Sequence, residues 1–163
     1  MKKLILSVLV ANVALTGCQT VSNVANPAKA SVSTAQSKTE RNKANAIAFY
    51  EMAFNQHKVA EATAKYVGDT YLQHNPTVGD GGQAFIDAFV PFLKQHPKSS
   101  AKIHRVIAEG DLVVLHVHSQ LDENDRGEAV VDIFRFDDNG KIVEHWDTIQ
   151  AVPEKTVSGR SMF

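Results

Sequence analysis

Residues 129–151 carry the clearest structural signal in this sequence. They read AVVDIFRFDDNGKIVEHWDTIQA, two runs rich in β-branched and aromatic residues that are joined by Asp138-Asn139-Gly140. The Asn-Gly step supplies the positive φ angles that a tight hairpin turn requires. The segment is therefore predicted to form a two-stranded β-hairpin.

Side chains alternate between the two faces of each predicted strand. Asp132 shares its face of the first strand with Phe134, and Asp147 shares its face of the second strand with His145 and Ile149. Each strand thus places a carboxylate on a mostly apolar face. A carboxylate in such surroundings is either hydrogen-bonded scaffolding or a tuned acid or base.

The N-terminus has the pattern of an export signal. Lys2 and Lys3 precede an apolar run over residues 4–15, and Leu15-Thr16-Gly17-Cys18 follows. This pattern resembles a bacterial lipoprotein signal, which implies cleavage before Cys18 and acylation of that residue. A plain secretory signal is the alternative, although Cys18 is the only cysteine of the chain. The apolar run is too short for a membrane-spanning helix, which needs about 20 residues.

The resemblance divides the chain into a signal peptide (1–17), an acylated cysteine with a flexible tether (18–38) and one domain (39–163). The tether is rich in Ser, Thr, Ala, Asn and Gln and has almost no large apolar residue, which is too little to offset the entropy of ordering. Gln19 after the cysteine implies the outer membrane over the inner one. We expect a periplasmic protein that contacts the membrane only through its lipid anchor.

Composition limits the classes of partner. A chain of 163 residues with 44% hydrophobic content can bury the core of one domain. The net charge is −1, and Lys and Arg are scattered along the chain, so no basic surface for nucleic acid is expected.

The remaining periodicity predicts an α+β fold. Helical spacing predicts three helices, over Ser37–Asn55, His57–Tyr66 and from Phe85 to Lys94 or Gln95. Period-two alternation predicts two strands before the hairpin, over Lys102–Ala108 and Asp111–Gln120. The connections between these strands are too short for parallel crossovers, so we expect an antiparallel sheet with the helices on one face.

Three polar residues of the hairpin are candidates for acid/base chemistry: Asp132, His145 and Asp147. Removal of a proton beside a carbonyl needs a base within hydrogen-bond reach and a donor for the enolate oxygen. Either aspartate could be the base. The candidate donors are His74, Asn75, His116 and His118. The structural alternative is that Asp147 only caps a strand end and that Asp132 pairs with Arg105 or Arg135.

His116 and His118 alternate on one predicted strand, so both rings project from the same face. They could bind a metal if His74, Asp132 or Asp147 supplied a third ligand. The motif fixes only two ligands, and the chain has no second closely spaced ligand pair to complete a site. We therefore predict no metal and expect both histidines to line a pocket or to be structural, with a metal-dependent enzyme as the alternative.

Several motifs together resemble one known family. The resemblance is to the SnoaL-like polyketide cyclase group of the nuclear transport factor 2-like superfamily, and it spans about Glu40 to Phe163. The motifs that carry it are Tyr71-Leu72-Gln73-His74-Asn75-Pro76, Glu109-Gly110-Asp111-Leu112-Val113-Val114, Asp132-Ile133-Phe134-Arg135-Phe136, Asp138-Asn139-Gly140-Lys141-Ile142-Val143-Glu144-His145-Trp146-Asp147 and Ser161-Met162-Phe163.

The resemblance implies a curved antiparallel sheet that is wrapped by about three helices into a cone with an apolar pocket, often as a homodimer. It also implies acid/base chemistry without a cofactor, with Asp147 as the base. Asp132 occupies the place of a supporting histidine in the characterised cyclases. The residues expected to line the pocket are His74, Asn75, His116, His118, His145, Trp146, Tyr50 and Phe134.

The function expected from these observations is that of a small-molecule pocket protein. It would bind a small apolar or carbonyl-containing molecule and catalyse an aldol-type closure, an isomerisation or a related proton transfer. Because this superfamily hosts many reactions and plain binding domains on one scaffold, a non-catalytic ligand-binding or interaction lipoprotein is the alternative.

Overall fold

The computed structural model describes the backbone of residues 27–163 and the side chains from residue 37 onward. The expected signal peptide, Cys18 and the first part of the expected tether lie outside the described residues. Among the helices that are described, none combines the length and the apolar character needed to cross a membrane.

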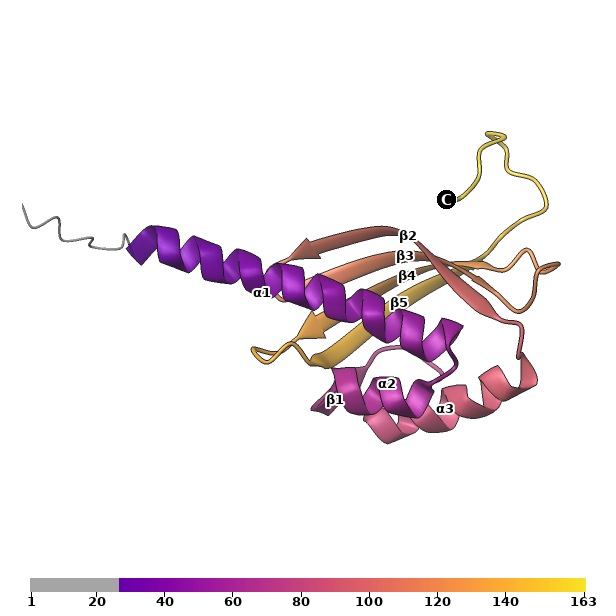
Figure 1. Ribbon diagram of the computed structural model, residues 1–163. Coiled ribbons are helices and arrows are strands. Elements are labelled where there is room, and N and C mark those ends of the chain that lie inside the picture. Colours follow the sequence, from indigo (N-terminus) through magenta and orange to yellow (C-terminus); the bar gives the residue numbers. More distant parts are fainter. Residues whose placement is uncertain (1–26) are drawn as a thin grey trace, which may run out of the picture.

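The described chain folds into helices packed on one face of a curved sheet, as Figure 1 shows. In chain order the elements are α1 (Pro27–Tyr50), a π-helical turn (Glu51–Asn55), α2 (Val59–Tyr66), β1 (Val67–Gln73), α3 (Gly82–Gln95), β2 (Ser100–Glu109), β3 (Leu112–Gln120), β4 (Glu128–Phe136) and β5 (Ile142–Ala151). This arrangement confirms the α+β fold class.

The sheet has the strand order β1-β5-β4-β3-β2. Strands β2 to β5 form the expected antiparallel meander. Strand β1 instead pairs parallel to β5, with Val67 opposite Ile142 and Gln73 opposite His145, so the prediction of a wholly antiparallel sheet was wrong at this edge. The short-connection argument applied only to neighbours in sequence, whereas the chain from β1 to β5 runs through α3 and the whole meander.

The second half of α1 supplies the apolar face that covers the sheet. Phe49 is 1% exposed and packs edge-on against Phe134 of β4, with ring centroids 5.8 Å apart. It also contacts Tyr66 of α2 and Phe85 of α3. Burial of one such side chain contributes roughly 2–3 kcal/mol, so Phe49 joins all three helices to the sheet.

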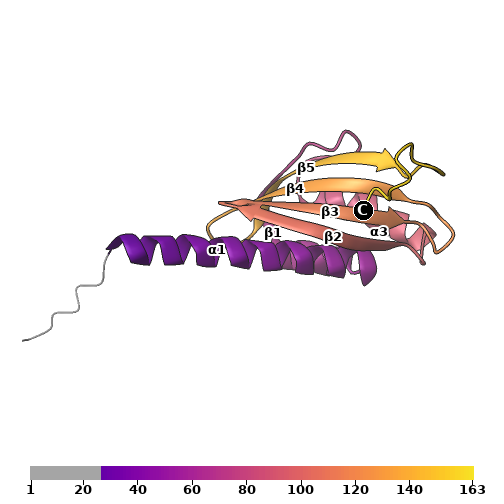
Figure 2. The same cartoon turned by 90° about the horizontal axis from the view of Figure 1, so that it is seen from above.

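Helix α1 begins earlier than expected. The capping-box pattern predicted a start at Ser37, but the helix already begins at Pro27. Proline fits the first helical position because its missing N–H has no partner there in any case. The first half of α1 extends beyond the edge of the sheet (Figure 2), so the end of the expected tether, residues 27–38, is drawn as a projecting helix.

The hairpin turn between β4 and β5 differs in detail from the prediction. Only Gly140 has a positive φ, of 80°, whereas Asn139 does not. The Asp137 carboxylate accepts hydrogen bonds from the backbone N–H groups of Asn139 and Lys141, at 2.9 and 2.8 Å. Asn45 of α1 donates to the Gly140 carbonyl oxygen at 2.8 Å, which fixes the turn to the helix layer.

Candidate active site

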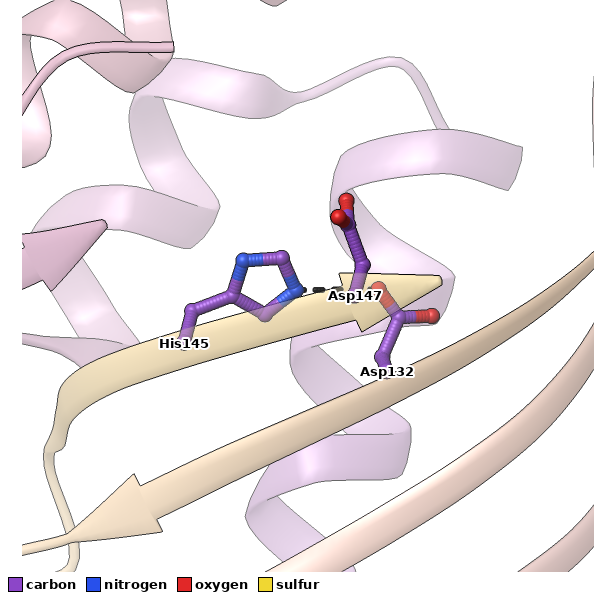
Figure 3. A group of neighbouring side chains, drawn as sticks. All are labelled: Asp132, His145 and Asp147. Atoms are coloured by element: carbon purple, nitrogen blue, oxygen red, sulfur yellow. Dashed lines mark hydrogen bonds and ion pairs between the residues drawn. The ribbon is translucent and has the colours of Figure 1, made fainter. Parts of the chain in front are cut away.

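The pairing of β4 with β5 brings the candidate catalytic side chains together. Asp132 lies directly opposite Asp147, and Phe134 lies opposite His145. Because side chains alternate along a strand, all four project from the same face of the sheet, the face that the helices cover. Figure 3 shows Asp132, His145 and Asp147 converging from the two strands.

These side chains form one end of a cavity of about 340 Å³ between the sheet and the helices. Asn75, Gln73, Tyr71 and Tyr50 complete the polar end. The rest of the wall is largely aromatic and aliphatic, and its main residues are Phe49, Phe54, Phe85, Phe89, Phe92, Leu93, Val130 and Phe134. The cavity therefore suits an apolar molecule with a polar group at one end.

Asp132 is the buried carboxyl of the site, with 5% of the residue exposed. The Tyr50 hydroxyl donates to its Oδ2 at 2.9 Å, and Nε2 of His145 lies 3.0 Å from its Oδ1. Burial raises the pKa of Asp132, the bonds from His145 and Tyr50 oppose that shift, and the charge of Asp147 adds to it. Burial likewise raises the pKa of Tyr50, which keeps its hydroxyl proton available to Asp132.

His145 connects Asp132 to strand β1. Its Nδ1 lies 2.8 Å from Oε1 of Gln73, and its ring stacks on Phe134 with centroids 4.9 Å apart. The residue is 7% exposed. Both ring nitrogens thus have a partner, and the ring plane is fixed by packing.

Asp147 is less buried than Asp132, and Asn75 holds it in place. The Asn75 Nδ2 group donates to Oδ2 of Asp147 at 2.6 Å. The other end of the Asn75 amide accepts hydrogen bonds from the backbone N–H and the hydroxyl of Thr77. Among the described residues no group bonds Oδ1 of Asp147, so this oxygen can approach a bound molecule.

The same residues offer a possible set of metal ligands. Each of Asp132, His145 and Asp147 offers one ligand atom, and these three atoms all lie within 4.8 Å of one another. His145 and Asp132 are bonded to each other in this arrangement, so an ion would have to break that hydrogen bond.

Neither structural alternative for the two aspartates is observed. Arg135 bonds Glu144 and Asp111, and Arg105 bonds His116, so neither arginine pairs with Asp132. Asp147 lies within β5 and does not cap its end. Of the residues expected in the pocket, Tyr50, Asn75, Phe134 and His145 do line it.

His74 and Trp146 do not line the cavity, which corrects the prediction for both. Trp146 alternates with His145 and Asp147, so it projects from the opposite, outer face of the sheet. His74 stacks on it with centroids 4.9 Å apart and bonds Glu144 at 2.9 Å. The hairpin pattern alone did not indicate which face the helices would cover.

His116 and His118 also lie on the outer face, so they do not line this cavity, and they cannot share a metal with Asp132 or Asp147. The buried residues of β3 are Val113, Leu115 and Val117, which alternate with the two histidines. On the outer face the C-terminal Phe163 stacks on His118, with ring centroids 4.3 Å apart, and also contacts His104.

Sequence reasoning missed Gln73 and Tyr71 as site residues. No strand was predicted from the sequence before Lys102, whereas Val67–Gln73 form β1. Tyr71, Gln73 and Asn75 alternate along this segment and all line the cavity. That period-two pattern of polar residues was the available signal.

Solved structures similar to this one have the same fold. One is a protein from Bacillus cereus with the provisional name polyketide cyclase, at 23% identity and TM-score 0.58, covering 68% of this chain and 74% of that chain. Another is a nuclear transport factor 2-like protein of unknown function from Mesorhizobium loti, at 19% identity and TM-score 0.58, covering 70% and 94%. A third, from Kribbella flavida, has the provisional name ketosteroid isomerase, at 17% identity and TM-score 0.56, covering 73% and 84%.

No curated protein matches the chain in sequence. The SnoaL-like domain family matches residues 46–145, a range that runs from the core helix α1 to His145 in the site. The chain therefore belongs to the SnoaL-like domain family and shares the nuclear transport factor 2-like fold.

Proposed function

We propose that this protein is an acid/base catalyst that moves a proton next to a carbonyl group of an apolar small molecule. The observation that supports this most is the convergence of two unlike carboxyl groups on one cavity. Asp147 is partly exposed and no described residue bonds its Oδ1, whereas Asp132 is buried and paired with His145. Two titratable groups in contrasting environments are typical of an acid and base pair.

In the proposed step Asp147 is the general base. Its Oδ1 takes the proton from the carbon beside the carbonyl. The electron pair of that C–H bond forms a C=C bond, and the carbonyl π electrons move to the oxygen, which the Asp132–His145 pair stabilises by hydrogen bonding. Return of the proton to a conjugated carbon gives an isomer, and attack of the enolate carbon on a second carbonyl gives an aldol product.

The shape of the cavity supports the choice of substrate class. Phe54, Phe85 and Phe89 form its apolar wall on the helix side, away from the strands that carry the two aspartates. A ring system would pack against these aromatic side chains and present its carbonyl to the polar end. A charged substrate would have to give up its hydration in this mostly apolar space.

The test uses 2-tetralone, a bicyclic ketone, in deuterated buffer. We expect the protein to accelerate deuterium incorporation beside the carbonyl. Asp147→Asn should lower that rate by about 10²- to 10⁴-fold, the usual contribution of a general base. The melting temperature should stay within a few degrees, because an asparagine oxygen still accepts the bond from Asn75.

Asp138→Asn is the matched control, since the side chain of Asp138 is 92% exposed and lies in the hairpin turn. Exchange that is equal in wild type, Asp147→Asn and buffer alone would contradict the catalytic proposal. Tight binding of 2-tetralone without exchange would instead identify the cavity as a binding site only.

For the cell, we propose a lipid-anchored protein on the periplasmic side of a bacterial membrane, with the outer membrane preferred. The support is the signal-like sequence that ends in Cys18. Labelling with an alkyne-tagged palmitate should modify the wild-type protein and not Cys18→Ser. Labelling of both proteins would contradict an anchor at Cys18.

We also propose a homodimer that forms through the outer face of the sheet. Two apolar side chains on this face remain well exposed, Ile107 at 64% and Val131 at 38%. A second copy of the same face would remove both from water, as in a symmetric dimer.

A further inference from the structure

Gln73 connects the hydrogen bonds that reach Asp147 with those that reach Asp132. Its Oε1 accepts a hydrogen bond from the backbone N–H of Asn75 at 2.9 Å and lies 2.8 Å from Nδ1 of His145. Asn75 in turn donates a hydrogen bond to Asp147, and His145 contacts Asp132. The proposed step above assigns no role to Gln73.

The neighbours of Gln73 determine which way its amide faces. A backbone N–H can only donate, so the atom that bonds the Asn75 N–H is the amide oxygen. The Gln73 Nε2 group accordingly donates to the Tyr71 hydroxyl at 3.2 Å. An amide oxygen has no proton to give, so Nδ1 of His145 must carry the proton in the bond between them.

The proton on Nδ1 determines which protonation states of His145 and Asp132 are consistent with the contact between them. Nε2 of His145 lies 3.0 Å from Oδ1 of Asp132, and Oδ2 is occupied by the Tyr50 hydroxyl. With one ring proton already on Nδ1, the contact is a hydrogen bond only if a further proton lies between Nε2 and Oδ1. The pair is then either imidazolium with carboxylate or neutral imidazole with carboxylic acid. Burial, which raises the pKa of Asp132, favours retention of this proton.

We propose that Gln73 is a positioning residue that holds His145 with its proton on Nδ1, so that the His145–Asp132 pair carries one transferable proton and acts as the acid of the site. The inference rests on the proposed function for its partner base, Asp147. As Asp147 takes the proton from carbon, the proton between Nε2 and Oδ1 moves to the carbonyl oxygen. The product is an enol, and the pair is left as a carboxylate beside a neutral imidazole that still donates from Nδ1 to Gln73.

The test reads the ring protons of His145 directly and needs no substrate. Long-range ¹H–¹⁵N correlation spectra of the labelled protein at pH 7 distinguish protonated from unprotonated ring nitrogens, and the signals can be assigned through the side-chain carbons. We expect Nδ1 of His145 to be protonated in the wild-type protein. In Gln73→Met, which keeps the chain length but removes the acceptor, we expect Nδ1 to lose its proton and Nε2 to donate to Asp132.

Two further variants separate this role from a general disturbance of the fold. Gln73→Glu retains an acceptor oxygen and should keep the proton on Nδ1. Gln83→Leu removes a surface glutamine of α3 that bonds only Asp87 among the described residues, and it should leave the His145 signals unchanged. If Gln73→Met does not fold, the wild-type and Gln73→Glu spectra can still overturn the inference.

A wild-type spectrum with Nδ1 unprotonated would overturn the inference. A protonated Nδ1 that persists in Gln73→Met, or that is lost in Gln73→Glu, would overturn the assignment to Gln73. These outcomes are independent of the exchange assay. The expected spectra without Asp147-dependent exchange would support the proton arrangement and contradict the catalytic proposal. Asp147-dependent exchange without the expected spectra would support the catalytic proposal and contradict the proton arrangement.

Discussion

Asp132 and Asp147 lie directly opposite each other on β4 and β5, yet their surroundings differ. Asp132 is buried and bonded to Tyr50 and His145, whereas Asp147 is partly exposed and bonded to Asn75. Two neighbouring carboxylates resist simultaneous ionisation, and the more buried group is the one that keeps its proton more readily. This difference supports the proposal that Asp147 is the base and that Asp132 with His145 is the acid.

The hydroxyl of Tyr50 is predicted to stabilise the fold through Asp132. Tyr50→Phe leaves Oδ2 of Asp132 buried without its donor, which should lower the free energy of unfolding by about 1–3 kcal/mol. Urea unfolding at pH 7 measures this change. Tyr66→Phe is the control, because no described residue hydrogen-bonds its hydroxyl, and an equal loss in both variants would contradict the role of the Tyr50–Asp132 bond.

Stability should depend on pH through Asp132. Its pKa is raised in the folded protein, mainly by burial. Above pH ~4 an unfolded aspartate has released its proton while the folded one still binds it, so this group lowers wild-type stability as the pH rises towards its folded pKa. Asp132→Asn has no such proton, and its amide can still bond Tyr50 and His145. Its unfolding free energy relative to wild type should therefore increase as the pH is raised above about 4.

Chemical denaturation of both proteins between pH 4 and pH 8 checks this sign. Asp138→Asn is the control, because Asp138 is exposed and its pKa is lowered by the neighbouring Lys38. A difference between Asp132→Asn and wild type that shrinks with rising pH would show that the folded carboxyl is ionised more readily than an ordinary aspartate.

The sequence was sufficient to predict the three helices, the meander and the shared face of Asp132 and Phe134. These features follow from periodicity within continuous segments, which local sequence records directly. Each aspartate was predicted to lie on a mostly apolar face of its own strand. The pairing of β4 with β5 shows that these two faces are one and the same.

The features of the fold and the site that the sequence did not predict depend on contacts between segments that are distant in sequence. Strand β1 pairs with β5 across about 70 residues of sequence, as the Gln73 to His145 bond illustrates, and no local pattern encodes that pairing. His116 and His118 were predicted to line the pocket, because the alternation of side chains defines two faces of a strand but does not indicate which face is buried. The helix layer decides this, and it covers the side of Val113, Leu115 and Val117.

The outer face of the sheet is predicted to form the dimer interface. Val131→Arg places a charge at the centre of this face and should weaken association at least 100-fold, which corresponds to about 2.7 kcal/mol. Sedimentation velocity measures the change. Val157→Arg alters a fully exposed residue outside the sheet and should leave the oligomeric state unchanged. A wild-type protein that is monomeric at high micromolar concentration would contradict the prediction.

The size of the cavity should limit the substrate. Ala88 of α3 lines the cavity of about 340 Å³, and Ala88→Phe would fill part of it with a phenyl ring. We expect the KM for 2-tetralone in the exchange assay to rise at least tenfold, or about 1.4 kcal/mol. The proposed catalytic groups on β4 and β5 are untouched, so exchange at saturating ketone should persist. Ala64→Phe, on the exposed side of α2, is the matched control. An unchanged KM in Ala88→Phe would mean that the ketone reacts outside this cavity.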